Sequence, residues 1–312
     1  MVREYEFDDN IELMRKELKQ FVDRNSINAK VISLQVPEGL KRKALEIASF
    51  IEKDGYDVVL TTDPCWGACD LRVKEAEMVN ADLIIHVGHK KFIKHIESKI
   101  PIMYFLWKYD IKYNEEKIAH ELMKIKERKI GLICSVQYQD LMPDITEILQ
   151  KIGKNVEMGG AVLGCWTENA QRLNVDTFVY IGSGNFHAIG AKCKYVLDME
   201  SEEVREITDN IMTIEKKRFA SIEKARDGNI FALIVSSKPG QFELETAKKI
   251  KKNLQKKGKQ AFLLIMDEIT DIKLMGIDAD VFVNTACVRI RDDYFSKPVL
   301  NPEDVDILLG EV

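Results

Sequence analysis

The sequence has few cysteines, prolines and aromatic residues and lacks a long apolar run. Its 312 residues include 6 cysteines and 7 prolines, and aromatic residues make up 8%. Cysteines this sparse exclude the disulfide framework of a small secreted protein. No apolar run approaches the about 20 residues that a bilayer-spanning helix needs. The opening residues, MVREYEFDDN, lack the apolar core of a secretory signal. We therefore expect a cytoplasmic protein without a membrane partner.

The sequence also lacks an excess of positive charge. It has 46 Lys and Arg against 51 Asp and Glu, for a net charge of −5. No overall basic field would attract nucleic acid, so we expect no direct nucleic-acid partner. Hydrophobic residues make up 46% and charged residues 31%. This balance is typical of a globular protein with true apolar cores.

Two common cysteine motifs are absent. The stretch DPCWGACDL (63–71) spaces Cys65 and Cys69 as C-x3-C, and no further cysteine follows two residues later. The spacing is therefore neither the C-x-x-C of a paired-thiol redox site nor the linear CxxxCxxC loop of many iron–sulfur enzymes. The partners of these thiols must be sought elsewhere in the chain.

The chain repeats one strand–helix pattern three times, with a period of about 100 residues, too long for a solenoid. Apolar runs rich in β-branched residues predict buried strands, and amphipathic stretches between them predict helices. The predicted strands lie within segments 30–36, 56–62 and 81–89, then 129–136, 155–165 and 176–184, then 229–237, 260–266 and 279–287. Segment 155–165 runs from a strand into a glycine-rich loop, and segment 279–287 ends just past its strand at Cys287. Such βαβ units form parallel sheets with right-handed crossovers.

We therefore predict an α/β protein of three related Rossmann-like domains with parallel sheets, arranged around a central site. The predicted domains are residues 1–110, 111–225 and 226–312. Between the second and third copies, residues 201–228 are rich in charge and predict one long helix, with apolar residues along one side.

Four cysteines fall in loops at the carboxyl ends of predicted strands, where open α/β sheets bind ligands. Cys65 and Cys69 belong to the first copy, Cys165 to the second and Cys287 to the third. One thiolate from each copy would make a metal site with a free position, either an open zinc site or a [4Fe–4S] cluster with one unligated iron. The alternative is that each thiol is packed in its own loop. Two further cysteines are predicted core thiols: Cys134 and Cys193.

A set of short segments, in order along the whole chain, resembles the archaeal diphthamide-synthesis enzyme family. These are VPEGL (36–40), WGACDL (66–71), LGC (163–165), SSKPGQ (236–241), NTACVRI (284–290) and SKPVLNPED (296–304). The resemblance implies 2-(3-amino-3-carboxypropyl)histidine synthase activity, the first step of diphthamide formation. The family transfers the 3-amino-3-carboxypropyl group of S-adenosylmethionine, as a radical, to an imidazole carbon of a histidine in translation elongation factor 2.

The resemblance also implies a homodimer, an electron donor that the sequence does not identify, and one [4Fe–4S] cluster per chain. Its ligands would be one cysteine from each domain: Cys69, Cys165 and Cys287. Cys65 then becomes a neighbour, packed near the cluster with Trp66.

Two loops are candidates for the S-adenosylmethionine pocket. Glycines allow close backbone approach, a lysine pairs with a carboxylate, and a glutamine recognises a polar edge. The candidates are Gly182, Gly184 and His187 in GSGNFH, and Lys238, Gly240 and Gln241 in SSKPGQ. Each residue is alternatively explained by turn geometry alone.

Other interpretations stay open at this stage. Quinolinate synthase also combines three α/β domains with one cysteine per domain on a [4Fe–4S] cluster. A non-enzymatic binding protein with packed cysteines is a further alternative. His86 and His89, in HVGH, are either metal ligands or residues of a packed or substrate-binding surface.

Overall fold

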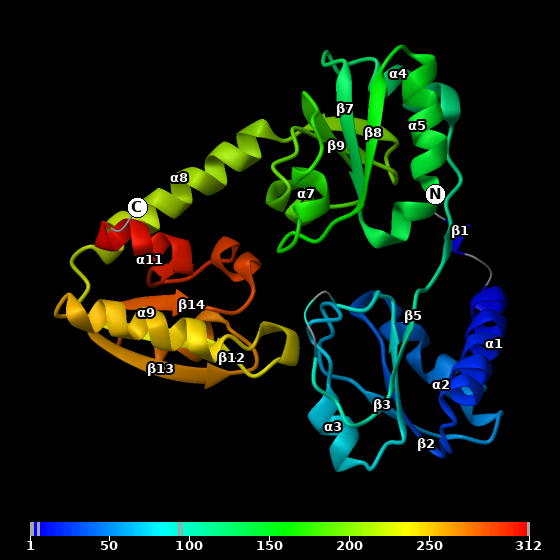
Figure 1. Cartoon of the computed structure of the whole chain (residues 1–312), viewed down its shortest axis with the longest axis horizontal. Coiled ribbons are helices and arrows are strands. Elements are labelled where there is room, and N and C mark those ends of the chain that lie inside the picture. The colour runs from blue at the N-terminus through cyan, green and yellow to red at the C-terminus, as the bar shows by residue number, and fades with distance from the viewer. Residues whose placement is uncertain (1–2, 5–6, 93, 95, 311–312) are drawn as a thin grey trace. The chain divides into compact units, whose positions relative to one another are not determined.

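The computed structural model describes residues 3–4, 7–92, 94 and 96–310. The chain forms two compact units (Figure 1). The first unit comprises Met1–Lys112 with the short segment Lys238–Gly240, and the second comprises Tyr113–Ser237 with Gln241–Val312. Among the described residues, no helix has the length and apolar character needed to cross a membrane.

The first unit is built on a four-stranded parallel sheet. Its strand order is β3 (Asp57–Thr61), β2 (Val31–Gln35), β4 (Leu83–Val87) and β5 (Ile102–Phe105). Helices α1 (Phe7–Asn25) and α2 (Ala44–Glu52) bury their apolar faces against one side, and α3 (Val73–Met78) packs on the other. A 3-10 helix (Glu38–Lys43) precedes α2, and β1 (Arg3–Glu4) pairs with β6 (Tyr109–Asp110).

The second unit contains a five-stranded sheet with the strand order β11-β10-β9-β7-β8. Its strands are β7 (Lys129–Cys134), β8 (Asn155–Ala161), β9 (Thr177–Ile181), β10 (Tyr195–Asp198) and β11 (Glu203–Glu206), and its helices are α4 (Glu115–Leu122), α5 (Met142–Lys151), α6 (Glu168–Gln171) and α7 (Phe186–Gly190). All pairings are parallel except β10 with β11.

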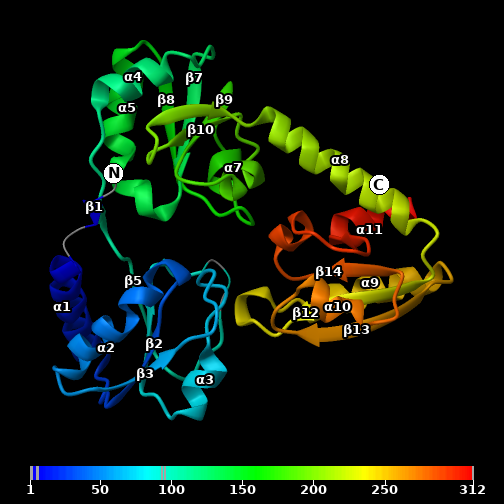
Figure 2. The same cartoon turned by 180° about the vertical axis from the view of Figure 1, so that it is seen from behind.

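The prediction of one helix over 201–228 is wrong at its start. Residues Glu203–Glu206 form β11, and helix α8 runs only from Thr208 to Ala225 (Figure 2). The segment EVRE contains one apolar residue among three charged ones, and β10 offers it an antiparallel partner through which it completes its backbone hydrogen bonds. Pairing along an edge therefore overrides the local charge pattern that favoured a helix.

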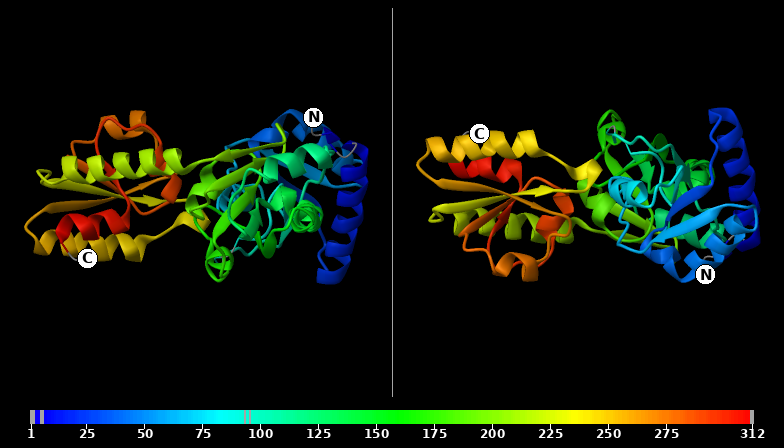
Figure 3. Two further views of the ribbon diagram at one scale, coloured as in Figure 1. Left: turned by 90° about the horizontal axis from the view of Figure 1, so that it is seen from above. Right: turned by 90° about the horizontal axis from the view of Figure 1, so that it is seen from below.

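The second unit also contains a four-stranded parallel sheet in the order β13-β12-β14-β15. Its strands are β12 (Ile230–Ser236), β13 (Gln260–Met266), β14 (Val281–Asn284) and β15 (Val299–Leu300). The end of α8, α9 (Leu244–Lys256) and α11 (Pro302–Leu309) cover one face, and α10 (Asp271–Met275) covers the other. Figure 3 shows this sheet edge-on between its helices.

The predicted fold class is confirmed: the chain is α/β with three parallel-dominated sheets. The sheets span 31–105, 129–206 and 230–300, one within each predicted domain range, while the domain boundaries themselves stay a prediction. All three sheets place a cysteine-bearing loop after the carboxyl end of a strand, namely β3, β8 and β14.

Candidate functional site

Solvent exposure divides the six cysteines into two sets of three. Cys165 is exposed, and Cys69 and Cys287 are partly exposed. The other three are buried: Cys65, Cys134 and Cys193. Burial raises the pKa of the Cys193 thiol to about 12, as expected for a core thiol that stays protonated. The accessible set is the same three cysteines that the family resemblance implies as ligands.

Cys69 lies in a tight loop of the first unit. The Asp70 N–H donates to the Gly67 carbonyl at 2.9 Å, which closes the turn around the cysteine. A Cβ on Gly67 would lie 3.5 Å from Cys69 Sγ. On the other side, the Gly240 N–H donates to the Cys69 carbonyl at 2.9 Å. The segment Lys238–Gly240 therefore braces the backbone of Cys69 directly.

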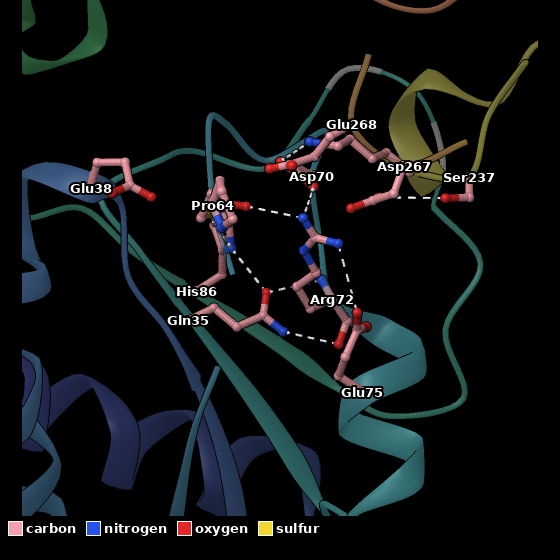
Figure 4. A network of polar contacts seen from close by, with 12 residues as sticks. Gln35, Glu38, Pro64, Asp70, Arg72, Glu75, His86, Ser237, Asp267 and Glu268 are labelled. Atoms are coloured by element: carbon pink, nitrogen blue, oxygen red, sulfur yellow. Dashed lines mark hydrogen bonds and ion pairs between the residues drawn. The ribbon is translucent and has the colours of Figure 1, made fainter. Parts of the chain in front are cut away.

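A buried group of charges stands beside this loop (Figure 4). Lys238 Nζ lies 2.7 Å from Asp70 Oδ2, and Arg72 Nη2 lies 3.3 Å from Asp70 Oδ1. The side-chain exposures of Asp70, Lys238 and Arg72 are 0%, 6% and 7%. Arg72 Nη2 also donates to the Pro64 carbonyl at 3.1 Å. Two cations thus neutralise one carboxylate next to Cys69, and both ends of the loop are tied to that group.

Cys165 is presented at the tip of a two-residue turn after β8. Leu163 and Trp166 form an isolated antiparallel bridge, with backbone hydrogen bonds of 3.0 and 2.9 Å, so that only Gly164 and Cys165 lie between them. A Cβ on Gly164 would come within 2.5 Å of the Phe186 ring. A side chain at position 164 would therefore force the Phe186 ring to move, and Cys165 beside it is exposed.

His187 supports the same turn. Its Nδ1 accepts a hydrogen bond from the Gly164 N–H at 2.9 Å. Nδ1 must carry a lone pair for this contact, so the ring is neutral. Burial and the positive charge of Arg289 lower the pKa of His187, which is consistent with a neutral ring. His187 is thus located beside the loop that carries Cys165.

Cys287 follows β14 in a loop that is held by buried amides. Asn284 Nδ2 donates to the Cys287 carbonyl and to Asn301 Oδ1, both at 2.8 Å. Asn284 Oδ1 accepts from the Ala286 N–H at 3.0 Å. Asn301 itself caps α11 through a capping box with Asp304. The segment NTAC is therefore held by both the nitrogen and the oxygen of the Asn284 side-chain amide.

The structure distributes the six candidate pocket residues between the two units. Lys238 and Gly240 contact Asp70 and Cys69 in the first unit. Gly182 and Gly184 follow β9 in the second unit with φ of +155° and +74°, conformations that favour glycine. The remaining two, also in the second unit, are His187 and Gln241. Their contacts with S-adenosylmethionine stay a prediction.

Sequence reasoning missed the polar residues that hold the cysteine loops in place. The main ones are Gln35, Asp70, Arg72, Asn284 and Asn301. A weak signal was available: Asp70 and Asn284 are polar residues within the GACDL and NTAC motifs, next to strand ends. Their partners are distant in sequence, and only the fold brings them together.

Comparison with known proteins places these loops in a family context. The family model of diphthamide synthesis proteins matches residues 36–312. The chain is 35% identical to the 2-(3-amino-3-carboxypropyl)histidine synthase of Pyrococcus horikoshii, over 95% of this chain and 88% of that protein. It is 31% identical to subunit 1 of the Saccharomyces cerevisiae synthase, over 90% of this chain and 71% of that protein.

A solved structure is also similar over the whole chain. The crystal structure of Dph2 from Pyrococcus horikoshii with a 4Fe-4S cluster covers 100% of this chain and 92% of its own, with 32% identity and a TM-score of 0.87. These matches favour the diphthamide interpretation over the quinolinate synthase and non-enzymatic alternatives.

Proposed function

Because the chain belongs to the diphthamide synthesis protein family, we propose that it modifies a histidine of translation elongation factor 2. The chain is an enzyme of the 2-(3-amino-3-carboxypropyl)histidine synthase type, a transferase of diphthamide biosynthesis. The proposed reaction moves the 3-amino-3-carboxypropyl group of S-adenosylmethionine to an imidazole carbon. The observation that carries the proposal is the trio of accessible cysteines, each on a loop after a parallel strand.

The three accessible cysteines fit a [4Fe–4S] cluster as its ligands. Thiolates are the usual ligands of such clusters, and four are the usual number. Cys69, Cys165 and Cys287 would supply three and leave one iron for the substrate. When bound and reduced, the cluster supplies one-electron cleavage of the bond from sulfur to the methionine γ-carbon, which yields an aminocarboxypropyl radical.

The chain's own contribution is to hold the three thiol-bearing loops rigidly. A different polar contact holds each loop. The Asp70–Lys238 ion pair holds the loop of Cys69, the Gly164–His187 hydrogen bond that of Cys165, and the Asn284 amide that of Cys287. When the thiol positions are fixed in advance, little conformational entropy is lost as the substrate binds. Fixed positions also limit which carbon–sulfur bond of the sulfonium is presented for cleavage.

Substrate contacts are proposed for the glycine-rich loop after β9 and for the SSKPGQ loop. Gly182 and Gly184 lack side chains that would obstruct a ligand near their backbone. Gln241 would recognise a polar edge. The contact of Lys238 with Asp70 supports a role for Lys238 in positioning Cys69. If Lys238 also binds the carboxylate of the substrate, that carboxylate and Asp70 would share the positive charge of Lys238.

The proposed partners follow from the family. They are elongation factor 2 as protein substrate, a second copy of the chain in a homodimer, and a one-electron donor. A cytoplasmic location is proposed because translation factors are modified there.

The test is an anaerobic assay with reduced protein, S-adenosylmethionine and elongation factor 2. We expect release of methylthioadenosine and a mass gain of one aminocarboxypropyl group on the factor. A factor whose target histidine is replaced serves as the control and should gain no mass. Absence of cleavage, or release of deoxyadenosine in place of methylthioadenosine, would contradict the proposal.

A further inference from the structure

Three metal-binding side chains lie together in the first unit, separate from the three proposed cluster ligands. They are Cys65, in the loop after β3, His86, in β4, and His89, just beyond it. Cys65 Sγ lies 4.0 Å from His86 Nε2, and His86 Nε2 lies 3.1 Å from His89 Nδ1. One ligand atom from each residue lies within 4.8 Å of the other two. Cys65 and His86 are buried, and His89 is partly buried.

A glycine allows the two histidines to approach each other. Gly88 has φ of +87°, and a Cβ there would lie 2.8 Å from Pro37 Cγ. With this left-handed residue the chain turns directly after β4. The imidazole rings of His86 and His89 then lie with their centroids 5.2 Å apart.

The hydrogen bonds of Gln35 determine which nitrogen of His86 is available. The Arg72 N–H donates to Gln35 Oε1 at 3.3 Å, and Gln35 Nε2 donates to the Arg72 carbonyl at 3.2 Å. These two backbone contacts fix the orientation of the amide. Gln35 Oε1 also lies 3.4 Å from His86 Nδ1, so Nδ1 carries the proton (Figure 4). The lone pair of His86 is consequently on Nε2, which lies 3.1 Å from His89 Nδ1, while Cys65 Sγ lies 4.0 Å from both ring nitrogens of His86.

From this arrangement we propose that Cys65, His86 and His89 bind a divalent metal ion of the zinc class. Zinc–nitrogen and zinc–sulfur bonds of ordinary length, at tetrahedral angles, separate two nitrogens by about 3.3 Å and a nitrogen from a sulfur by about 3.6 Å. The observed separations of 3.1 and 4.0 Å are each within a few tenths of an ångström of these values. A histidine whose second nitrogen donates to a carbonyl oxygen is the usual arrangement at a zinc site, and Gln35 supplies that oxygen.

The protonation states of Cys65 and His86 without metal are consistent with a site in which the metal replaces the thiol proton of Cys65. Burial, followed by the charge of Asp70, raises the pKa of Cys65 to about 12, so the thiol is protonated without metal. Burial lowers the pKa of His86 to about 3, so its ring is neutral and ready to coordinate. Metal binding releases the thiol proton, and the fourth position takes a water.

Such a site would brace the loop that presents Cys69. Cys65 is four residues before Cys69, and a metal bond would tie it to the end of β4. The proposal does not depend on the proposed function, because metal binding is measured without S-adenosylmethionine or elongation factor 2.

The experiment is a Co²⁺ titration of the full chain carrying Cys69→Ala, Cys165→Ala and Cys287→Ala, which removes the proposed cluster ligands from competition. Co²⁺ occupies sites similar to those of zinc and gives thiolate-to-cobalt absorption. We expect about one Co²⁺ per chain with this absorption, displaced by Zn²⁺. Adding Cys65→Ser should abolish the absorption, and adding His89→Gln should weaken binding by at least about 10-fold.

Adding His120→Gln instead should leave the titration unchanged, because His120 is an exposed histidine of α4. Circular dichroism of each variant shows whether it is folded. The Gln35→Leu variant provides a second measurement, since it leaves all three ligands in place and should weaken Co²⁺ binding about 10–100-fold. The proposal is overturned if the parent shows no thiolate-to-cobalt absorption, or if the folded Cys65→Ser protein retains it.

Discussion

Lys238 and Asp70 are 168 residues apart in sequence, yet their side chains meet at 2.7 Å inside the first unit. Both are almost fully buried. Gly240 also donates a backbone hydrogen bond to the Cys69 carbonyl. The short segment 238–240 therefore both neutralises Asp70 and holds the backbone of Cys69.

Lys238→Met should strongly destabilise the first unit. The change removes the 2.7 Å contact from buried Asp70 and leaves the longer Arg72 contact at 3.3 Å. Removing one partner of a buried ion pair costs about 3–5 kcal/mol. Urea unfolding measures this loss, and Lys273→Met, which breaks an exposed pair with Glu268, should change stability by less than about 1 kcal/mol. If the two variants are equally stable, the buried pair has no structural importance.

Replacing each accessible cysteine should remove the iron–sulfur cluster. Iron and sulfide content after anaerobic purification is expected to fall to background in Cys69→Ala, Cys165→Ala and Cys287→Ala. Cys65→Ala should retain the cluster, since its thiol is buried and its pKa is raised to about 12. Loss of iron from Cys65→Ala together with retention in Cys69→Ala would show that the ligand assignment is wrong.

Gly240→Ala should disturb Cys69 through the backbone. The added Cβ would lie 2.5 Å from Cys69 Cα and 2.8 Å from its carbonyl oxygen, and backbone atoms cannot move away as a flexible side chain can. Overpacking of this kind costs about 1–3 kcal/mol. We expect lower stability in urea and a reduced iron content.

Gly276→Ala is the matched control for Gly240→Ala. Its added Cβ meets nothing within 4 Å, and its φ of −76° suits alanine. Equal effects of the two substitutions would refute the close contact between Gly240 and Cys69.

Below pH 6.5, His187 should make the second unit less stable. Unfolded histidine binds a proton near pH 6.5. In the folded state, burial and Arg289 lower the pKa of His187. Between the two pKa values the unfolded state holds more protons, so stability falls as the pH falls, by at most about 1.4 kcal/mol per pH unit.

The His187→Asn variant isolates this contribution. Asparagine Oδ1 is able to accept from the Gly164 N–H without titrating. Urea unfolding between pH 7.5 and pH 5 should therefore show a smaller pH dependence for the variant than for the parent protein. Identical pH profiles would mean that His187 does not titrate with unfolding.

The regular elements could be predicted because their signals are local. The apolar β-branched runs at 31–35, 129–134 and 230–236 are buried first strands, and the amphipathic pattern of 244–256 is a helix. Short elements with weak patterns were missed, among them β5 and α11. β11 was predicted as helix because its strand pairing with β10 lies outside any local pattern.

By itself, the sequence determined which cysteines stand on loops at strand ends, because element type and chain position decide that. Only the tertiary structure decided what holds each loop. Lys238 reaches Asp70, Asn284 reaches Asn301, and Gln35 orients His86 through contacts between segments distant in the chain. Buried polar groups need hydrogen-bond partners, but which partner is in reach depends on how strands and loops pack. For that reason the sequence indicated the proposed ligands, and the fold identified the residues that hold their loops.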